Sequence, residues 1–378
     1  MSYSYDISAL GKKIHQNRHR LGLTQASLAE KLHISFQAIS GWENSTSVPD
    51  LENLCKLSEI FGVELGELLK SEKDTLPMMI GIDGGGTKTE FALFDTSGHV
   101  YKRVRLSGCN ASLVGLEQTL NILTQGINAC LDENPNVVAV FVGIAGPKLD
   151  IINQTLSERY PKMSIVVRSD GVNAFCSGVG DFALICGTGS IIITTDENGY
   201  RRIAGWGARM GDSGSAYNFG RAALRHALAY EDNLTSHSPL YDILLKKLNT
   251  ERVRTAFSAL DVPGIASLSV AVFEAFENGC EVSAKIIDDE MKELAWLLDS
   301  AFPHGGVAVM CGGVMEHRSN ILFPILKKYL ASEFELTLPT LPPIYGACVA
   351  CCKEQKISIG DDFESNFSQS YHEIINKI

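Results

Sequence analysis

The sequence predicts an all-α domain followed by a larger α/β domain that is built from two similar halves. Apolar residues recur at helical spacing through residues 7 to 70, and a polar segment that ends in proline covers residues 71 to 77. A pattern of strand, glycine turn and strand then occurs twice, roughly a hundred residues apart. A chain of 378 residues is also long for one hydrophobic core, because domains typically hold about 100 to 200 residues.

Composition excludes several classes of protein. No window approaches the ~20 uninterrupted apolar residues that a membrane helix needs, and the N-terminus lacks the basic and then apolar plan of a signal peptide. We therefore expect a cytoplasmic protein with no membrane partner, whose ten cysteines are reduced thiols. The net charge of -11 argues against a nucleic-acid partner for the chain as a whole, but residues 1 to 70 are close to neutral. A local basic face is expected from six residues of the first helix: Lys12, Lys13, His15, Arg18, His19 and Arg20.

Four short helices are expected between residues 7 and 70. The first ends at Gly22, and N-caps at Thr24, Ser35 and Asp50 open the other three. Helices of about eight residues joined by a short turn are too short to be stable alone, so they must pack together as a helix-turn-helix unit. The residues expected in its core are Leu28, Ala29, Ile39 and Trp42.

The stretch LTQASLAEKLHISFQAISGWEN and the residues after it resemble the helix-turn-helix of Cro and phage-repressor type regulators. The resemblance implies that Gln25 contacts backbone phosphate and that Phe36, Gln37 and Ser40 face base edges in the major groove. A helical docking module without DNA affinity is the alternative. Because one such unit makes few phosphate contacts, we expect a homodimer on DNA. The candidate DNA contacts are Arg18, Gln25, Ser35, Phe36, Gln37 and Ser40.

Two glycine turns, in MMIGIDGGGTKTE and in FALICGTGSIIIT, each lie between two strands. Glycines allow backbone N–H groups to approach an anion closely, and Thr87, Lys88, Thr188 and Ser190 add further donors. A Walker loop would lead into a helix instead. Two tight hairpins without a ligand are the alternative, but matching chemistry in both halves favours a shared phosphate ligand.

This plan resembles the phosphate loops of the actin, hexokinase and Hsp70-like ATPase fold, an α/β fold of duplicated ribonuclease H-like halves. The resemblance implies ATP held between two lobes, residues 78 to 180 and 181 to 355, with Asp83 binding Mg²⁺ through water. Residues 356 to 378 are then a C-terminal tail. A strand, Gly-Gly and helix pattern near residue 312 suits the adenosine side. The implied nucleotide contacts are Asp83, Gly84, Gly85, Gly86, Thr87, Lys88, Gly187, Thr188, Gly189, Ser190, Gly312 and Gly313.

Three further motifs, SGCN, SDGVNA and GWGARMGDSGSAY, suit a sugar, because fixed polar groups meet hydroxyls and an aromatic face covers the ring. With GIDGGGTKTE, CGTGS and CGGV, they occur in the order and spacing of N-acetylglucosamine kinases of the BadF/BadG/BcrA/BcrD ATPase family, over residues 78 to 355. The resemblance implies that Asp170 accepts the proton of a sugar hydroxyl; the alternative is that Asp170 caps a helix. The implied sugar contacts are Asn110, Asp170, Gly205, Trp206, Gly207 and Asp212.

One departure leaves the activity open. Relatives commonly read GDEGS, whereas Ser213 occupies the place of that carboxylate here. The chain is then either an active amino-sugar kinase with a regulatory DNA-binding domain or a transcription regulator that senses sugar without turnover. A third reading is an ATPase activator of a CoA dehydratase, which holds an iron–sulfur cluster. Cys348, Cys351 and Cys352 keep that reading open, although their Ala-rich surroundings favour a buried helix.

Overall fold

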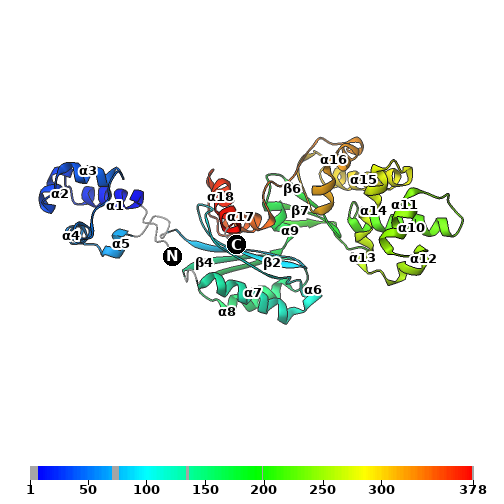
Figure 1. The fold of residues 1–378 in the computed structure, drawn as a ribbon, viewed down its shortest axis with the longest axis horizontal. Coiled ribbons are helices and arrows are strands. Elements are labelled where there is room, and N and C mark those ends of the chain that lie inside the picture. The colour runs from blue at the N-terminus through cyan, green and yellow to red at the C-terminus, as the bar shows by residue number, and fades with distance from the viewer. Residues whose placement is uncertain (1–6, 70–75, 133–135, 198, 377–378) are drawn as a thin grey trace. The chain divides into compact units, whose positions relative to one another are not determined.

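The computed structural model describes residues 7–69, 76–132, 136–197 and 199–376. It divides into two compact units, Met1–Pro77 and Met78–Ile378 (Figure 1). Most of the segment predicted as a linker, residues 71 to 77, lies outside the described residues. Within the described part of the chain, no helix has the length and apolar character that crossing a membrane requires.

The first unit consists of helices, as predicted, and the structure adds α5 to the four helices expected. They are α1 (Ile7–Arg20), α2 (Gln25–Leu32), α3 (Phe36–Glu43), α4 (Leu51–Phe61) and α5 (Leu65–Leu69). The predicted caps are confirmed, because the side chains of Thr24, Ser35 and Asp50 each accept a backbone N–H from the first turn of the following helix. The predicted core is also confirmed. Leu28, Ala29, Ile39 and Trp42 are buried among side chains of α1, α4 and α5.

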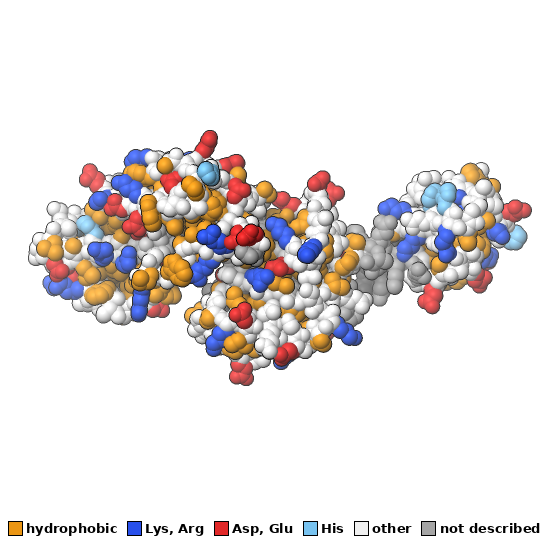
Figure 2. Space-filling model, turned by 180° about the vertical axis from the view of Figure 1, so that it is seen from behind, with side chains coloured by type: hydrophobic (Ala, Val, Ile, Leu, Met, Phe, Trp, Pro, Cys, Tyr) orange, Lys and Arg blue, Asp and Glu red, His pale blue; other side chains and the backbone are white. Residues whose placement is uncertain are grey.

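Surface charge on the first unit is mixed. Figure 2 shows Lys and Arg side chains interspersed with Asp and Glu on the face in view. The expected basic face on α1 is weaker than its sequence suggests, because Arg18 is buried and Arg20 donates to the carbonyl oxygen of Phe61 at 2.5 Å. Two of the four Lys and Arg residues of α1 therefore stabilise the domain itself.

The second unit contains two five-stranded sheets of the same topology. Sheet A has the order β3-β2-β1-β4-β5 and sheet B the order β8-β7-β6-β9-β10, each with three antiparallel strands followed by two parallel ones. This repetition confirms the duplicated α/β fold. Sheet A is built from β1 (Met78–Gly84), β2 (Lys88–Asp95), β3 (Val100–Ser107), β4 (Val137–Ile144) and β5 (Ser164–Ser169). Sheet B is built from β6 (Phe182–Cys186), β7 (Ser190–Asp196), β8 (Gly199–Ile203), β9 (Gly306–Cys311) and β10 (Phe334–Thr337).

Helices cover both faces of each sheet. One face of sheet A packs against α7 (Leu116–Leu131) and α8 (Leu149–Arg159), with the short α6 (Ala111–Val114) before them. The outer face of sheet B packs in one core with most of the helices from residue 216 to 329. These helices are α10 (Ala216–Glu231), α11 (Pro239–Leu248), α12 (Val253–Ala256), α13 (Val262–Ser267), α14 (Ser269–Glu277), α15 (Glu281–Ala301) and α16 (Gly313–Tyr329).

A central layer of helices joins the two sheets. It contains α9 (Gly171–Cys176) and α17 (Pro343–Glu354), which pack in one core with residues from both sheets, such as Ala92 and Ala183. The sequence predicts a second lobe that ends at residue 355. Helix α17 belongs to that range, but it packs against sheet A of the first lobe, where it contacts β1 and β4. The three cysteines of α17 are buried, as the Ala-rich sequence suggests.

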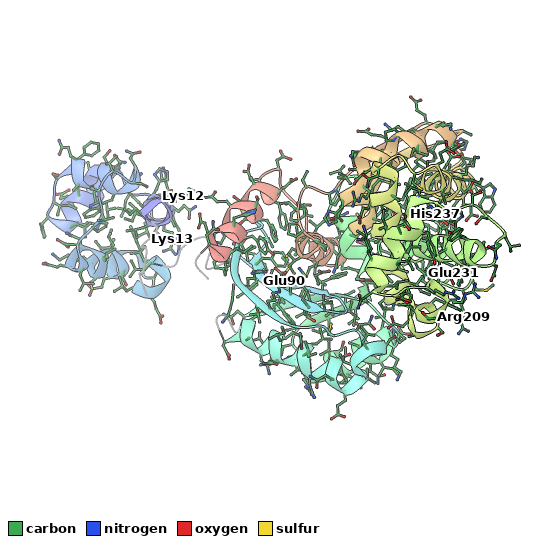
Figure 3. All side chains as sticks on the ribbon, turned by 45° about the vertical axis from the view of Figure 1, so that its right-hand side comes forward. Lys12, Lys13, Glu90, Arg209, Glu231 and His237 are labelled. Atoms are coloured by element: carbon green, nitrogen blue, oxygen red, sulfur yellow. The ribbon has the colours of Figure 1, made fainter. Side chains whose placement is uncertain are left out.

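The last helix, α18 (Phe363–Ile375), also packs on sheet A. The central core includes three buried side chains of this helix, Phe363, Phe367 and Tyr371. The sequence predicts only a tail over residues 356 to 378. The hydroxyl of Tyr371 donates to the buried carboxylate of Glu90, which lies between β2 and the C-terminal helices in Figure 3. The apolar stripe that these three residues form at helical spacing explains the docking.

Candidate functional site

The first glycine turn connects β1 to β2 at the end of the central strand of sheet A. The N–H of Gly85 donates to the carbonyl oxygen of Lys88 at 2.9 Å, which closes the hairpin. The SGCN segment lies directly behind it, because the N–H of Cys109 donates to the carbonyl oxygen of Gly85 at 3.1 Å. Gly86, Thr87 and Lys88 are exposed, so their N–H groups and side chains remain accessible to an anion.

The second glycine turn has the equivalent place in sheet B. The N–H of Gly187 donates to the carbonyl oxygen of Gly189 at 2.9 Å, and the first turn of α10 donates to the carbonyl oxygens of Gly187 and Thr188. Gly312 lies beside this turn with a φ of +88°, and a Cβ there would be 2.5 Å from the carbonyl oxygen of Cys186. The structure therefore brings the second predicted loop and the Gly-Gly turn together.

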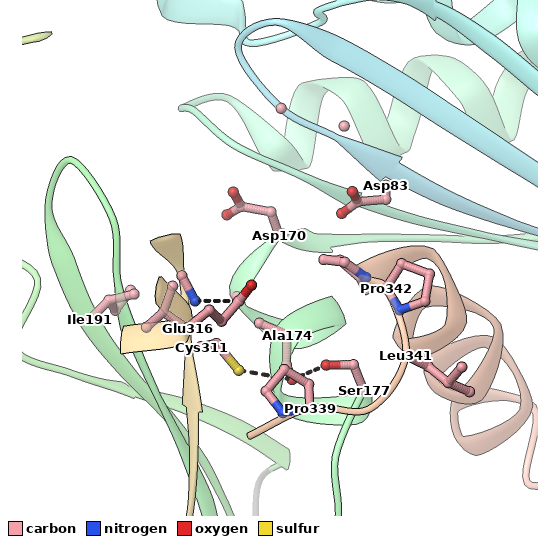
Figure 4. A pocket seen from close by; sticks show the side chains of 16 residues that line it. Asp83, Asp170, Ala174, Ser177, Ile191, Cys311, Glu316, Pro339, Leu341 and Pro342 are labelled. Atoms are coloured by element: carbon pink, nitrogen blue, oxygen red, sulfur yellow. Dashed lines mark hydrogen bonds between the residues drawn. The ribbon is translucent and has the colours of Figure 1, made fainter. Parts of the chain in front are cut away.

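A cavity of about 460 Å³ is lined by residues from both sheets (Figure 4). Asp83 and Gly85 of the first loop line it together with Asp170, and Cys311, Gly312 and Glu316 line the opposite wall. Figure 4 shows the carboxylates of Asp83 and Asp170 on the same side of the lining residues. Two segments remote in sequence thus place two carboxylates beside the first glycine turn.

Asp170 does not cap the helix that follows it. Its side chain makes no capping bond to α9, and the N–H of Gly171 donates instead to the hydroxyl of Ser169 at 3.3 Å. The Asp170 carboxylate accepts from the same Ser169 hydroxyl at 3.2 Å and otherwise lines the cavity. Burial raises the pKa of Asp170 above its usual value, which makes the ionised carboxylate a stronger base.

Asp83 is the second carboxylate of the cavity. Burial raises its pKa to about 6, and the negative charge of Asp170 acts in the same direction, while a hydrogen bond from Asn173 opposes the shift. Two neighbouring carboxylates beside N–H donors suit a hard divalent cation bound together with phosphate. Within the described ranges, no group of three or more His, Cys, Asp or Glu side chains could hold a metal ion. A cation here would therefore need phosphate or water oxygens to complete its coordination.

Of the predicted sugar contacts, Asp170 lines this cavity and the others do not. Asn110 caps α6 by accepting the N–H of Ser112 at 2.9 Å. Asp212 is buried and accepts the N–H of Gly207 at 3.1 Å, so it holds its own loop together. Trp206 is 73% exposed, with the guanidinium of Arg202 4.8 Å from its ring.

Two carboxylates of helix α15 accept hydrogen bonds from residues 213 and 214, next to the predicted sugar contact Asp212. Sequence reasoning missed these two carboxylates. The carboxylate of Glu290 accepts the N–H of Gly214 at 2.9 Å, and the hydroxyl of Ser213 donates to Glu293 at 3.4 Å. A carboxylate thus stands beside Ser213, although it comes from a helix about 80 residues further along the chain. No local motif indicates this contact.

A second cavity of about 310 Å³ adjoins the second loop. Thr188 and Gly313 line it together with Phe273 of α14 and Arg318 of α16. The Arg318 guanidinium lies 5.1 Å from the Phe273 ring and donates to Glu277 at 2.7 Å. An aromatic ring and a planar guanidinium beside a phosphate loop suit a nucleobase. Sequence reasoning missed both residues, because they belong to helices far apart in the chain.

Some of the candidate DNA contacts are exposed on α3, and others are engaged in hydrogen bonds inside the domain. Phe36 is 49% exposed, Gln37 is exposed and Ser40 is partly exposed, whereas Ser35 uses its hydroxyl as the cap of α3. Gln25 donates to the carboxylate of Glu43 at 2.7 Å. The side chains that remain most available to a groove are therefore Phe36 and Gln37.

Arg18, which the sequence predicts to contact DNA, is buried inside the helix-turn-helix domain. It is 6% exposed, and its guanidinium donates to Glu43 through Nε at 2.5 Å and Nη2 at 2.9 Å, and to the carbonyl oxygen of Leu23 through Nη1 at 2.7 Å. A buried guanidinium whose three nitrogens all bond inside the domain presents little surface to DNA. The basic side chain instead fixes α1 against α3.

Comparison with known proteins matches two parts of the chain. The model of the BadF/BadG/BcrA/BcrD ATPase family matches residues 80–348, and a helix-turn-helix model matches residues 14–68. N-acetyl-D-glucosamine kinase of Dictyostelium discoideum is 28% identical over 319 residues, which cover 74% of this chain and 99% of that protein. The HTH-type transcriptional activator BcrR of Enterococcus faecalis is 42% identical over 62 residues, which cover 16% of this chain and 30% of that protein.

A solved structure agrees on the fold of the second unit. A candidate N-acetylglucosamine kinase from Chromobacterium violaceum superposes with a TM-score of 0.56 at 19% identity, covering 72% of this chain and 98% of that one. The chain therefore belongs to the BadF/BadG/BcrA/BcrD ATPase family, with an actin-like ATPase fold preceded by a helix-turn-helix domain of the Cro and repressor type.

Proposed function

We propose that the protein transfers the γ-phosphoryl group of ATP to an amino sugar of the N-acetylglucosamine type and that its helix-turn-helix domain makes it a sugar-responsive transcription regulator. The observation that carries the kinase part is the cavity in which a phosphate-type glycine loop adjoins Asp83 and Asp170. Membership of an ATPase family, and similarity to an N-acetyl-D-glucosamine kinase along 99% of that protein, support the same assignment.

The nucleotide lies across both cavities in this proposal. The backbone N–H groups of Gly86, Thr87 and Thr188, which are exposed residues, hold the phosphates. Phe273 and Arg318 hold the nucleobase. Asp83 would hold Mg²⁺ through water, and the ion would supply positive charge beside the phosphates. Gly312 and Gly313 connect the two cavities, since the first lines the larger one and the second lines the smaller one.

Asp170 is the general base of the transfer. Its carboxylate takes the proton of a sugar hydroxyl while the hydroxyl oxygen forms a bond to the γ-phosphorus and the bond to the β–γ bridging oxygen breaks. The products are a sugar phosphate and ADP. The raised pKa of Asp170 suits this role, and Ser169 keeps one carboxylate oxygen oriented through its hydroxyl.

The sugar is held by residues of both lobes. Trp206 offers an exposed aromatic face, and Asn110 offers an amide from the SGCN segment behind the first loop. We propose that Asp212 acts through the loop backbone rather than on the sugar, because it accepts the N–H of Gly207. The sugar residues do not line the cavity of Asp170, so productive binding requires the two lobes to approach each other.

DNA binding is assigned to α3, with Gln37 as the residue that reads a base. A single helix-turn-helix makes few phosphate contacts and would bind at about 10⁻⁴ to 10⁻⁶ M, so regulation requires a homodimer on a two-fold site. Sugar or nucleotide then acts by changing the separation of the two reading helices. The iron–sulfur alternative receives no support, because no group of three or more His, Cys, Asp or Glu side chains among the described residues could hold a metal ion.

The kinase assignment is tested with purified protein, magnesium-ATP and each of glucosamine, N-acetylglucosamine and N-acetylmuramic acid. Release of ADP that depends on one sugar supports the assignment. Saturable sugar binding without any ADP release would instead favour the sensor, a reading that Ser213 keeps open. The regulator assignment is tested by selecting duplexes from a random pool with and without that sugar, and a protein that selects no sequence contradicts it.

A further inference from the structure

Asn173 occupies an unusual place between the two carboxylates of the cavity. It lies on α9, three residues after Asp170, and it is fully buried. Its side-chain Nδ2 donates to Oδ1 of Asp83 at 2.7 Å, to the carbonyl oxygen of Gly143 at 3.2 Å and to that of Ile82 at 3.4 Å. One amide therefore touches both central strands of sheet A at the level of Asp83.

The surroundings determine which way this amide faces. The three atoms around Nδ2 are all acceptors, so a rotated amide would place its own oxygen against three other oxygens. Oδ1 of Asn173 has no hydrogen-bond partner among the described residues. Leaving a buried acceptor unpaired lowers the stability of the fold, so this arrangement is maintained at the expense of stability. Such groups call for an explanation beyond packing.

Two glycines make room for Asn173. A Cβ at Gly143 of β4 would lie 2.0 Å from Oδ1 of Asn173, and a Cβ at Gly346 of α17 would lie 1.8 Å from its carbonyl oxygen. Any other residue at either position would displace α9. The side chain and the backbone of Asn173 are thus confined from two sides by segments far apart in the sequence.

We infer that Asn173 is a positioning residue that orients the Asp83 carboxylate for a magnesium–nucleotide complex and fixes its distance from Asp170. The inference rests on the proposed nucleotide site. By donating to one oxygen, Asn173 leaves the other oxygen of Asp83 to face the cavity. Asp170 immediately precedes the same short helix, so the position of α9 also determines the position of the Asp170 carboxylate. Partners that orient a group bound to a metal typically change metal affinity by about 10- to 100-fold when they are replaced.

The test measures ADP binding by the full chain at increasing Mg²⁺ and again in a chelator. Asn173→Asp replaces the donor by an acceptor of the same shape, so it repels Asp83. We expect this variant to need about 10- to 100-fold more Mg²⁺ for the same ADP affinity, while its affinity in chelator stays close to that of the unchanged protein. Asn153→Asp is the matched control, because Asn153 on α8 uses only its oxygen, which accepts the N–H of Val167, and an aspartate retains that acceptor.

A merely structural role for Asn173 would weaken ADP binding equally with and without Mg²⁺, and this result would overturn the inference. An unchanged Mg²⁺ requirement would overturn it as well. If Asn173→Asp does not fold, Asn173→Ala carries the same test, since it removes the donor without adding charge. The readout involves no sugar, so a protein that binds magnesium-ADP without phosphorylating any sugar still tests Asn173. Failure of the kinase assignment and failure of this inference are therefore distinguishable.

Discussion

Arg18 and Glu43 form an ion pair inside the helix-turn-helix domain, with 2.5 Å between Nε and Oε1 and side chains only 7% and 3% exposed. The same carboxylate accepts from Gln25 at 2.7 Å and contacts His15 at 3.0 Å. Glu43 of α3 is thus joined to α1 and α2. The orientation of the reading helix depends on this network, because a buried charge requires its partners.

Arg18→Met should destabilise the first unit by about 3–5 kcal/mol, because it leaves the buried Glu43 carboxylate without its cation. Amide hydrogen exchange of residues 7–69 in the full chain measures this loss. Lys31→Met is the matched control, since Lys31 is exposed at the end of α2. A variant that keeps its exchange protection and loses only DNA affinity would show that Arg18 contacts phosphate after all.

The first unit should lose stability in acid through Glu43. Burial of this carboxyl favours its neutral form, but hydrogen bonds from Arg18, Gln25 and His15 outweigh burial and lower its pKa from 4.5 to about 2. The contribution is therefore complete above pH 4.5 and is lost as the pH falls through about 2. Exchange protection of α1 and α3, measured across this window, should fall in the unchanged protein. Glu43→Gln should be less stable at neutral pH and should show a flatter dependence.

Gln37→Ala should relax base preference at one position of each half-site. A bidentate contact between glutamine and adenine contributes about 1–3 kcal/mol of discrimination, whereas loss of a phosphate contact weakens binding to every sequence alike. Binding to duplexes with single-base substitutions measures the difference. Gln16→Ala on the exposed side of α1 is the control. Equal weakening for all duplexes would exclude Gln37 as a base-reading residue.

Trp206→Ala should weaken sugar binding while leaving the fold intact. An exposed ring contributes little to stability, but a stacked aromatic contact contributes roughly 1 kcal/mol, or about fivefold in affinity. Trp296→Ala is a close control, because Trp296 on α15 is 71% exposed against 73% for Trp206. Equilibrium binding of the sugar identified by ADP release gives the answer. An equal loss in both variants would remove Trp206 from the sugar site.

Local signals predicted much of this molecule. The caps at Thr24, Ser35 and Asp50 and both glycine hairpins depend on neighbouring residues, so a short window of sequence contains their cause. The repeated hairpin also predicted the duplicated sheets, because each copy specifies the same three antiparallel strands.

Contacts between distant segments could not be predicted in the same way. Arg18 looked like a surface cation because its partner Glu43 lies 25 residues away. Asn173 is 90 residues from Asp83, and the motif around it drew attention only to Asp170. Helix α17 has a weakly amphipathic, cysteine-rich sequence, which indicates burial but not which sheet covers it.

The central claim is that Asp170 is the base of a phosphoryl transfer to an amino sugar. The most direct measurement is the rate at which a phosphorylated sugar forms from γ-labelled ATP, in Asp170→Asn and in the unchanged protein, at equal sugar occupancy. Loss of a general base lowers such a rate by about 10²- to 10⁴-fold. We expect a loss in this range for Asp170→Asn and none for Asp150→Asn, whose carboxylate is exposed on α8. Formation of sugar phosphate by Asp170→Asn at the unchanged rate would contradict the account.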